Sequence, residues 1–354
     1  MITATGDVRI TRRYYRCRHC RTTQTPWDGW AGLGADHLTP HVRRLAVLGG
    51  TSWSFDMASA RLADFCEVRI SADVIRRVTN AAGQRAQAWQ AQGTQSGAVY
   101  RRAQGEIEFT TDGTCVNTRG GWREMRLGVF AKRRPGVPAA PEQWRTRKLP
   151  PPTARVAFAG IRPAEECGEQ WAARARQLGV DPRTTSITAL ADGAKWIWKQ
   201  VSEHLPKGEC VVDVFHVSEH LHACGRALHG ETTPQARDWA DTQLLALLKD
   251  GPVQTLAELK SQRRTQRSNR KRQALTELIN YMTPNVDGLR YRERLARGLP
   301  IGSGLIEGAC KTVVGKRLKH GGARWHVPRV ENVAALCCLL YSDEWEAFWQ
   351  ADAA

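Results

Sequence analysis

The sequence has no long hydrophobic run, few cysteines for its length and a shortage of acidic residues. No stretch approaches the roughly 18 consecutive apolar residues that a membrane span needs, and the opening MITATGD lacks the apolar core of a signal peptide. We therefore expect a soluble, cytoplasmic protein without a membrane partner. Ten cysteines in 354 residues are too dilute for a disulfide framework, and the adjacent Cys337 and Cys338 suit two bridges poorly, so we expect reduced thiols.

Core-forming residues and positive charge are both plentiful. Apolar residues make up 42% of the chain, 13 residues are tryptophan and 25% are charged, which excludes a disordered protein. At roughly 100 to 200 residues per domain, two or three domains fit this length. The chain has 52 Lys and Arg against 35 Asp and Glu, a net charge of +17. This excess favours a nucleic-acid partner over the alternative of a merely basic enzyme.

The positive charge is concentrated in the C-terminal third, in clusters at 260–272, 290–297 and 311–329. One such run is typical of a solvated helix face, whereas three in succession indicate a nucleic-acid-binding surface. The residues expected to contact DNA there are Arg263, Arg264, Arg267, Lys311, Lys316, Arg317, Lys319, Arg324 and Trp325. A place in the core is the alternative for Trp325.

The first hundred residues read as short helices. Thr39 with Pro40 opens one, Ser54 or Asp56 caps a second, and Ser71 caps a third. The last two resemble a helix-turn-helix, and a three-helix cluster that never touches DNA is the alternative. With the apolar side chains of the third helix turned inward, the residues expected to face DNA are Arg76, Arg77, Thr79 and Asn80.

Strand patterns begin at about residue 98. We predict strands at 107–112, 123–132, 154–160, 185–192 and 209–215, and helices at 164–178 and 195–205. A meander of three strands followed by helix, strand, helix and strand is the order of the ribonuclease-H-like fold. The predicted class is therefore α/β: a ribonuclease-H-like mixed five-stranded sheet with helices, interrupted by an α-helical insertion, plus an N-terminal α-helical DNA-binding region.

Three acidic residues stand where chemistry is expected. Asp112 closes the first predicted strand, Asp192 closes the fourth, and Glu307 lies just inside a helix opened by a Gly-Ser-Gly segment. The first and fourth strands of such a sheet are parallel neighbours, so their carboxylates approach each other and repel unless divalent cations neutralise them. Hard oxygen ligands favour Mg²⁺ or Mn²⁺, and two such ions can activate a water or a 3′-hydroxyl on a phosphodiester. Turn and helix-dipole roles are the alternatives.

Four sequence blocks resemble a known family. These are TDG at 111–113, ADGAKWIW at 191–198, DVFHV at 213–217 and PIGSGLIEG at 300–308. They resemble DDE transposases of bacterial insertion sequences, in particular the ISKra-type group related to the Mutator-like superfamily, over roughly residues 8–350. The resemblance implies that Asp112, Asp192 and Glu307 form the catalytic triad and hold two Mg²⁺ (or Mn²⁺) ions, with Asp213 and His216 as a D-x-x-H pair.

The second metal ligand is argued from strand position. Asp213 sits within a predicted apolar strand, whereas Asp192 sits at a strand exit, where a metal ligand is needed. We therefore assign Asp192 to the metal. Asp213 and His216 would then orient a DNA phosphate or the sheet edge, and a buried Asp–His hydrogen bond that only stabilises the strand is the alternative.

Cys17 and Cys20 form half of a zinc site. His37 and His41 are a second pair, but the gap slightly exceeds the usual finger spacing, and Thr39-Pro40 lies between them. The family resemblance implies an upstream cysteine pair that this chain lacks, so we expect either a truncated start or no zinc.

The favoured hypothesis is a DDE transposase that cleaves insertion-sequence ends and joins the 3′-hydroxyl to target DNA. Its partners would be terminal inverted repeats and target DNA, bound as a homo-oligomer at the nucleoid. The alternatives are a truncated or domesticated, non-catalytic DNA-binding relative and a structure-selective nuclease of the same fold. The expected domains are a truncated zinc-ribbon-like segment at 1–36, the helix-turn-helix-like region at 37–97, catalytic core at 98–217, helical insertion at 218–300 and core helices at 301–354.

Overall fold

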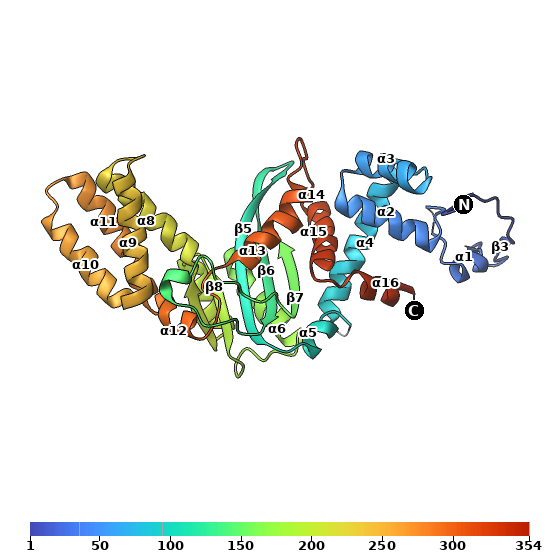
Figure 1. Cartoon of the computed structure of the whole chain (residues 1–354). Coiled ribbons are helices and arrows are strands. Elements are labelled where there is room, and N and C mark those ends of the chain that lie inside the picture. The colour runs from blue at the N-terminus through green and yellow to red at the C-terminus, as the bar shows by residue number, and fades with distance from the viewer. Residues whose placement is uncertain (35, 94, 354) are drawn as a thin grey trace.

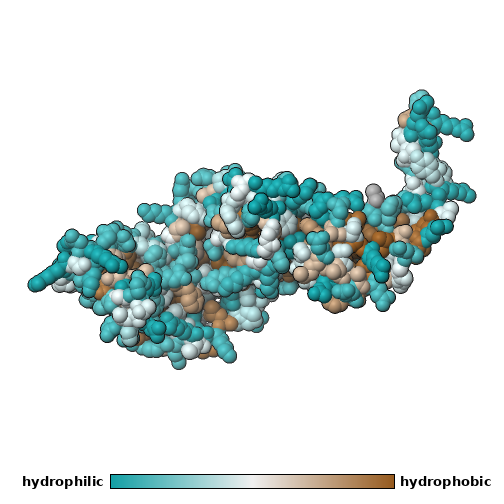
Figure 2. Space-filling model, turned by 90° about the horizontal axis from the view of Figure 1, so that it is seen from above, coloured by the Kyte–Doolittle hydropathy of each residue, from teal (hydrophilic) through white to brown (hydrophobic). Residues whose placement is uncertain are grey.

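The computed structural model describes residues 1–34, 36–93 and 95–353, and shows an elongated molecule built around a central sheet (Figure 1). A helical lobe lies at one end of the sheet and the N-terminal helices lie at the other. Seen from above, the N-terminal segment forms a narrow arm, and hydrophilic side chains cover most of this face (Figure 2). None of the described helices combines the length and the apolar character needed to cross a membrane.

The central sheet is mixed. Its five strands are β5 (Glu106–Thr118), β6 (Gly121–Arg133), β7 (Ala154–Gly160), β8 (Ile187–Ala191) and β9 (Gly208–Val212). They lie in the order β7-β6-β5-β8-β9. The pairs β5–β6 and β6–β7 are antiparallel, whereas β5–β8 and β8–β9 are parallel. The predicted mixed five-stranded sheet is confirmed, with every strand at or near its predicted position.

Helices cover both faces of the sheet. Successive side chains of each strand point to opposite faces, so each strand contributes residues to two cores. Phe109, Phe130 and Trp171 form a core with the helices on one face. Met125 and Leu127 belong to the core on the other face. The first face carries α6 (Ala164–Gln177) and α7 (Lys195–His204); the second carries α13 (Gly304–Ala309), the π-helical turn η3 (Cys310–Gly315), α14 (Lys316–Leu318) and α15 (Val327–Tyr341).

A helical lobe separates β9 from α13. It consists of α8 (Val214–His229), α9 (Pro234–Asp250), α10 (Pro252–Thr265), α11 (Asn269–Met282), the 3-10 helix η2 (Thr283–Leu289) and α12 (Tyr291–Ala296). Val212 of β9 belongs to the same buried core as Leu221 and Ile279 of the lobe. The fully buried Tyr291 donates from Oη to the carbonyl of Val212 at 2.8 Å. The lobe is therefore packed on the sheet rather than tethered by a linker.

The three predicted N-terminal helices form with their predicted caps. They are α2 (Pro40–Ser52), α3 (Phe55–Cys66) and α4 (Ala72–Gln92), capped by Thr39, Ser54 and Ser71. Their core includes residues of α15 and of α16 (Trp345–Ala353), such as Leu336 and Phe348. Gly83 of α4 lies against Asn332 of α15, where a Cβ would sit 2.4 Å from the Asn332 carbonyl oxygen. The N-terminal helices thus pack directly on the C-terminal ones.

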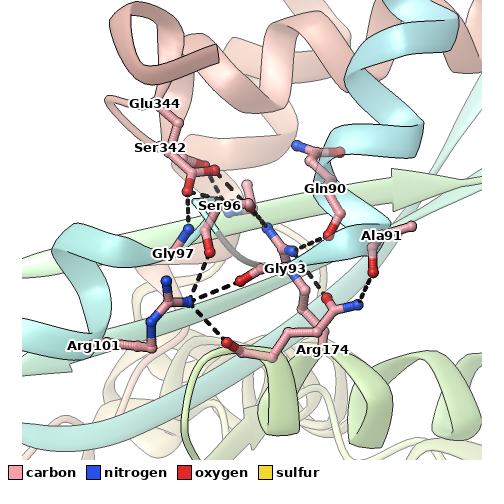
Figure 3. Close-up of polar contacts among 11 residues, drawn as sticks. Gln90, Ala91, Gly93, Ser96, Gly97, Arg101, Arg174, Ser342 and Glu344 are labelled. Atoms are coloured by element: carbon pink, nitrogen blue, oxygen red, sulfur yellow. Dashed lines mark hydrogen bonds and ion pairs between the residues drawn. The ribbon is translucent and has the colours of Figure 1, made fainter. Parts of the chain in front are cut away.

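A group of buried polar contacts holds Ser96 and Gly97, just before the short helix α5 (Ala98–Arg102), as Figure 3 shows. Arg174 of α6 donates to the carbonyl of Gln90 at 2.8 Å and to Ser96 Oγ at 2.9 Å. The Arg174 guanidinium also lies 3.9 Å from the buried carboxylate of Glu344. Burial raises the pKa of Glu344 and lowers the pKa of Arg174, and their mutual attraction opposes both shifts. This pair joins the N-terminal helices, α6 and the chain before α16.

Three smaller groups of elements complete the chain. Two short hairpins come first, followed by one short helix, and a 3-10 turn lies between β6 and β7. These elements are β1 (Ile2–Thr3), β2 (Gly6–Asp7), β3 (Tyr15–Arg16), β4 (Thr23–Gln24), α1 (Pro26–Trp30) and η1 (Pro141–Gln143).

Two strand ends differ from the prediction. β5 does not end at Asp112 but runs on to Thr118, and the chain reverses before Gly121, whose φ is +96°. β9 ends at Val212, and Asp213 caps α8 by accepting a hydrogen bond from the Phe215 amide at 2.9 Å. The predicted strand position of Asp213 is wrong because its carboxylate satisfies a free amide at the helix start.

Candidate active site

The parallel registers bring three aspartates to one level of the sheet. Thr110 of β5 pairs with Leu190 of β8, and Ala191 of β8 pairs with Val212 of β9. Continuing the first register by two residues places Asp112 opposite Asp192, and continuing the second by one places Asp192 opposite Asp213. The three aspartates therefore lie side by side at the carboxyl ends of β8 and β9. At the same level β5 does not end but continues into its hairpin with β6.

Asp112 is a half-buried carboxylate in a negative environment. Its Oδ1 accepts a hydrogen bond from the Gly113 amide at 2.7 Å. Burial raises the pKa of Asp112, and the charge of Asp192 raises it further, while the Gly113 amide and His216 oppose the shift. Asp112 and Asp192 are thus close enough to interact. A divalent cation between them would offset the free-energy cost of burying a charged carboxylate and the repulsion between the two.

Asp192 follows β8 as predicted and lies at a hollow of about 290 Å³. Its Oδ1 accepts a hydrogen bond from the Ala194 amide at 2.8 Å. Tyr281 of α11 donates from Oη to the Asp192 carbonyl at 2.9 Å, which fixes the backbone of this turn. His216 also lines the hollow. The helical lobe therefore forms one wall of the candidate site.

Glu307 approaches the site from the first turn of α13, on the helical layer that covers β5 and β6. Its side chain is exposed and pairs with Lys311 at 3.6 Å. Cys310, which begins the π-helical turn, has its Sγ 4.0 Å from Asp112 Oδ2. Burial, then Asp112 and then Glu307 raise the pKa of the Cys310 thiol to about 12, with Lys319 opposing. The charges of Asp112 and Glu307 thus both reach Cys310.

The carboxylates are near one another but do not form a ligand cluster. Over residues 1–34, 36–93 and 95–353, no group of three or more His, Cys, Asp and Glu side chains is arranged to hold a metal ion. Carboxylates repel one another when no cation is present, and here each one has another partner: the Gly113 amide, the Ala194 amide and Lys311. Asp112 and Asp192 carry oxygen ligands of the kind that Mg²⁺ and Mn²⁺ prefer, whereas Glu307 pairs with Lys311.

Asp213 has a structural role that the sequence did not predict. It is 1% exposed, and Ser303 donates a hydrogen bond to its Oδ2. The neighbouring Val214 amide donates to the Ile301 carbonyl at 2.9 Å. Asp213 therefore positions the segment that leads into α13 and Glu307. The alternative of a buried Asp–His bond is wrong, since exposed His216 has its Nδ1 3.3 Å from Glu219.

Two residues predicted to contact DNA are buried instead. Arg317 is 4% exposed, donates from Nε to the Gly50 carbonyl at 2.8 Å, and lies over the rings of Phe55 and Trp325. Trp325 is 8% exposed and donates from Nε1 to the Leu318 carbonyl at 2.9 Å. The prediction of DNA contact is wrong for both, because these side chains join α2 and α3 to the C-terminal helices.

The predicted DNA-facing side of α4 is only partly available. Arg76 and Arg77 both pair with Asp73, the latter at 3.1 Å. Asn80 donates from Nδ2 to the Arg76 carbonyl at 2.8 Å, and Thr79 is fully buried. The prediction for Thr79 is wrong because it faces Gly50 in the packed interior. Arg77 remains exposed, and its contact with DNA stays a prediction.

The basic clusters differ in how many of their side chains are available to contact DNA. At the tip of the lobe, Arg263 and Arg264 lie in the last turn of α10 and Arg267 lies between α10 and α11; the first two line a hollow of about 560 Å³. Among the described residues, no basic side chain of the 260–272 cluster has an ion-pair partner. By contrast Arg294 is 3% exposed and pairs with Glu209 at 2.9 Å, so this member of the 290–297 cluster is not available to DNA.

The Cys17 and Cys20 segment forms a tight exposed turn between β3 and β4. The Cys17 amide donates to the Thr22 carbonyl at 2.8 Å and the Arg21 amide donates to the Cys17 carbonyl at 3.0 Å. Hydrogen bonding to Thr22 and Cys17 lowers the pKa of Cys20 to about 7. A thiol of this kind can bind zinc, but the part of the chain that the structure describes supplies no third ligand, and His37 and His41 do not complete the site.

Comparison with known proteins gives one match. Residues 174–331 match the model of an uncharacterised protein family (UPF0236). The matched region covers less than half of the chain and includes Asp192, Asp213 and Glu307, but not Asp112. No curated protein matches the sequence.

We expect Asp112→Asn to raise the stability of the cation-free protein at pH 7. Because the folded pKa of Asp112 is raised, its ionised form costs stability above that pKa, and the cost disappears as the pH falls below the usual aspartate range near 4. Asparagine keeps the acceptor for the Gly113 amide without the charge. Thermal unfolding in a chelator checks this, and a variant less stable than wild type at pH 7 contradicts it. Added Mn²⁺ should stabilise wild type more than the variant.

Proposed function

We propose that the protein is a metal-dependent DDE transposase with a ribonuclease-H-like core. The observation that carries this proposal is the placement of Asp112 and Asp192 level with each other on adjacent parallel strands, where the charge of Asp192 raises the pKa of Asp112. Glu307 stands on α13, which packs over β5 and β6, one turn from the cysteine beside Asp112. Three carboxylates so arranged suit a pair of divalent cations at a phosphodiester.

The strand order supports the ribonuclease-H-like part of the proposal. A meander of β7, β6 and β5 is extended on the β5 side by parallel β8 and β9, which is the arrangement expected of that fold. The helical lobe enters after β9 and returns to the sheet at α13. Asp213 and Ser303 tie these two points together, so the lobe does not separate Glu307 from the aspartates.

Each residue of the candidate site would have a distinct role in this reaction. Asp112, Asp192 and Glu307 would hold Mg²⁺ or Mn²⁺, and the bound ions would activate a water or a 3′-hydroxyl and stabilise the leaving oxygen. Lys311 and Lys319, both exposed beside the site, would bind phosphates. Asp213 acts through Ser303 on the position of α13. DNA ends and target DNA would be bound by a homo-oligomer in the cytoplasm, at the nucleoid.

The basic tip of the lobe gives a prediction for DNA binding. Replacing Arg263, Arg264 and Arg267 with alanine should flatten the dependence of log K on log salt by about 0.9 per lost phosphate contact. Three dispersed, exposed arginines provide a control of equal charge: Arg102, Arg134 and Arg176. We expect the tip variant to bind DNA more weakly and with a shallower salt dependence. The control variant should retain most of the affinity and of the salt dependence. Equal slopes for the tip variant and wild type would place the tip on a solvated face.

A further inference from the structure

The hairpin of β5 and β6 extends beyond the rest of the sheet. β6 pairs with β7 only from Arg126 onward, and β5 pairs with β8 only as far as Thr110. The hairpin itself continues to the pair Thr118–Gly121. In Figure 1 this part of β5 and β6 rises past the end of β7, beside α14. The strands therefore form a two-stranded projection that begins at the level of Asp112.

The chain after α14 is attached to this projection. Thr118 forms a parallel bridge with Trp325, the Trp325 amide donates to the Asn117 carbonyl at 3.0 Å, and the Arg119 amide donates to the Trp325 carbonyl at 2.8 Å. Trp325 points into the core, so its neighbours Arg324 and His326 are turned outward by the alternation of an extended chain, and both are exposed. The tip is thereby fixed in place rather than free to swing.

The tip is basic and carries an exposed indole. Trp122 is 68% exposed. Arg119, Arg123 and Arg324 are exposed as well, and among the described residues none of the three has an ion-pair partner. Arg123 pairs with Val116 and so lies on the face of the hairpin that carries Trp325, whereas Trp122 pairs with Asn117 on the opposite face. The charge of Arg119, burial and the charge of Arg329 lower the pKa of His326, so these positive groups lie close together. The arginine-bearing surface is complementary to a polyanion.

The positive surface is continuous with the candidate active site. Lys319 donates from Nζ to Thr114 Oγ1, on the same face of β5 as Asp112, and its charge opposes the shift in the pKa of Cys310. From Asp112 to Thr118 the strand advances six residues, or about 20 Å at roughly 3.3 Å per residue. Duplex DNA advances about 3.4 Å per nucleotide along one strand, so this length corresponds to about six nucleotides.

We propose that the tip of the β5–β6 hairpin binds the duplex DNA that flanks the scissile bond, about six nucleotides from it. Arg119, Arg123 and Arg324 hold phosphates there. This inference rests on the proposed function, since it takes Asp112 as the point of cleavage. Of its three arginines, Arg324 belongs to a basic cluster already visible in the sequence, whereas Arg119 and Arg123 do not.

The test uses the full chain and a labelled duplex that carries the element end. We expect Arg119→Ala, Arg123→Ala and Arg324→Ala together to weaken binding at least about tenfold and to reduce the salt slope by about one per arginine. Trp122→Ala, on the opposite face of the hairpin, should change neither the affinity nor the slope by much. The dispersed triple variant of Arg102, Arg134 and Arg176 is the charge control, and unchanged thermal unfolding shows that the exposed substitutions leave the fold intact.

Phosphate ethylation interference then locates the contact. Wild type should show interference about six nucleotides from the cut, and the hairpin variant should lose that signal alone. A second experiment uses duplexes shortened stepwise from each end. Once the duplex is too short to reach the hairpin tip, the variant and wild type should bind it with equal affinity. If wild type cleaves the duplex but the hairpin variant matches it in slope and interference, the hairpin proposal is wrong while the proposed function stands. If wild type neither binds nor cleaves, the proposed function itself fails.

Discussion

Replacing Asp112 or Asp192 with asparagine should lower metal-dependent cleavage of element-end DNA by about a thousandfold or more, because each removes a charged ligand from a two-ion site. Glu307→Gln should have a similar effect if Glu307 leaves Lys311 to join the ions. DNA affinity should change little, since these carboxylates hold cations rather than phosphates. The measurement is a single-turnover cleavage assay in Mg²⁺ and in Mn²⁺, alongside a binding titration.

Two further variants sharpen this result. Glu124 is an exposed carboxylate on β6 whose charge also raises the pKa of Asp112, so Glu124→Gln is a matched control that should retain activity. Asp213→Asn should reduce cleavage less than Asp192→Asn, because it acts through Ser303 on the position of α13. An inactive Asp213→Asn variant with an active Asp192→Asn variant would reverse the assignment of the second ligand. Near wild-type cleavage by any triad variant would remove that residue from the site.

Arg317→Leu should cause a large loss of stability, on the order of 2 to 4 kcal/mol. The substitution deletes the donor to the Gly50 carbonyl and the cation stacked on Phe55 and Trp325. Lys316→Leu, at the exposed neighbouring position, is the control and should change stability by less than about 0.5 kcal/mol. Denaturant unfolding of the two variants measures the difference.

The same pair of variants tests the corrected role of Arg317. Because Arg317 is buried, Arg317→Leu should leave the salt slope of DNA binding unchanged in the fraction of protein that remains folded. Lys316→Leu, at an exposed position, can change that slope. If Arg317→Leu left stability unchanged and flattened the slope, Arg317 would be a DNA contact as the sequence suggested. That outcome would contradict the packing of the N-terminal helices on the C-terminal region.

The sequence predicted the sheet well because its signals are local. Alternating apolar residues mark each strand, and Ser or Thr caps mark α2, α3 and α4. The placement of Asp112 and Asp192 followed from strand order alone, since parallel neighbours bring their carboxyl ends to one edge. The sequence also indicated a helical segment at 218–300, although its first helix begins earlier, at Val214, within the predicted fifth strand.

What the sequence missed depends on contacts between distant segments. The first predicted strand ends at Asp112, yet β6 supplies a partner for every residue as far as Thr118, so the strand continues and the reversal is at Arg119-Gly120. The Gly120-Gly121 pair was the available signal for that turn. Arg317 and Trp325 look like DNA contacts in a basic run, and only the packing of Phe55 shows them to be buried. Cys310 gave no signal at all.

The most direct test of the central claim is joining by the wild-type protein. The substrate is a duplex that ends in the element's inverted repeat, read from the DNA beside the gene, with a free 3′-hydroxyl and a separate target duplex. The account predicts a covalent joined product that requires Mg²⁺ or Mn²⁺ and is absent with Asp192→Asn. Cleavage without joining would indicate a nuclease. DNA binding with neither cleavage nor joining in either cation would contradict the account.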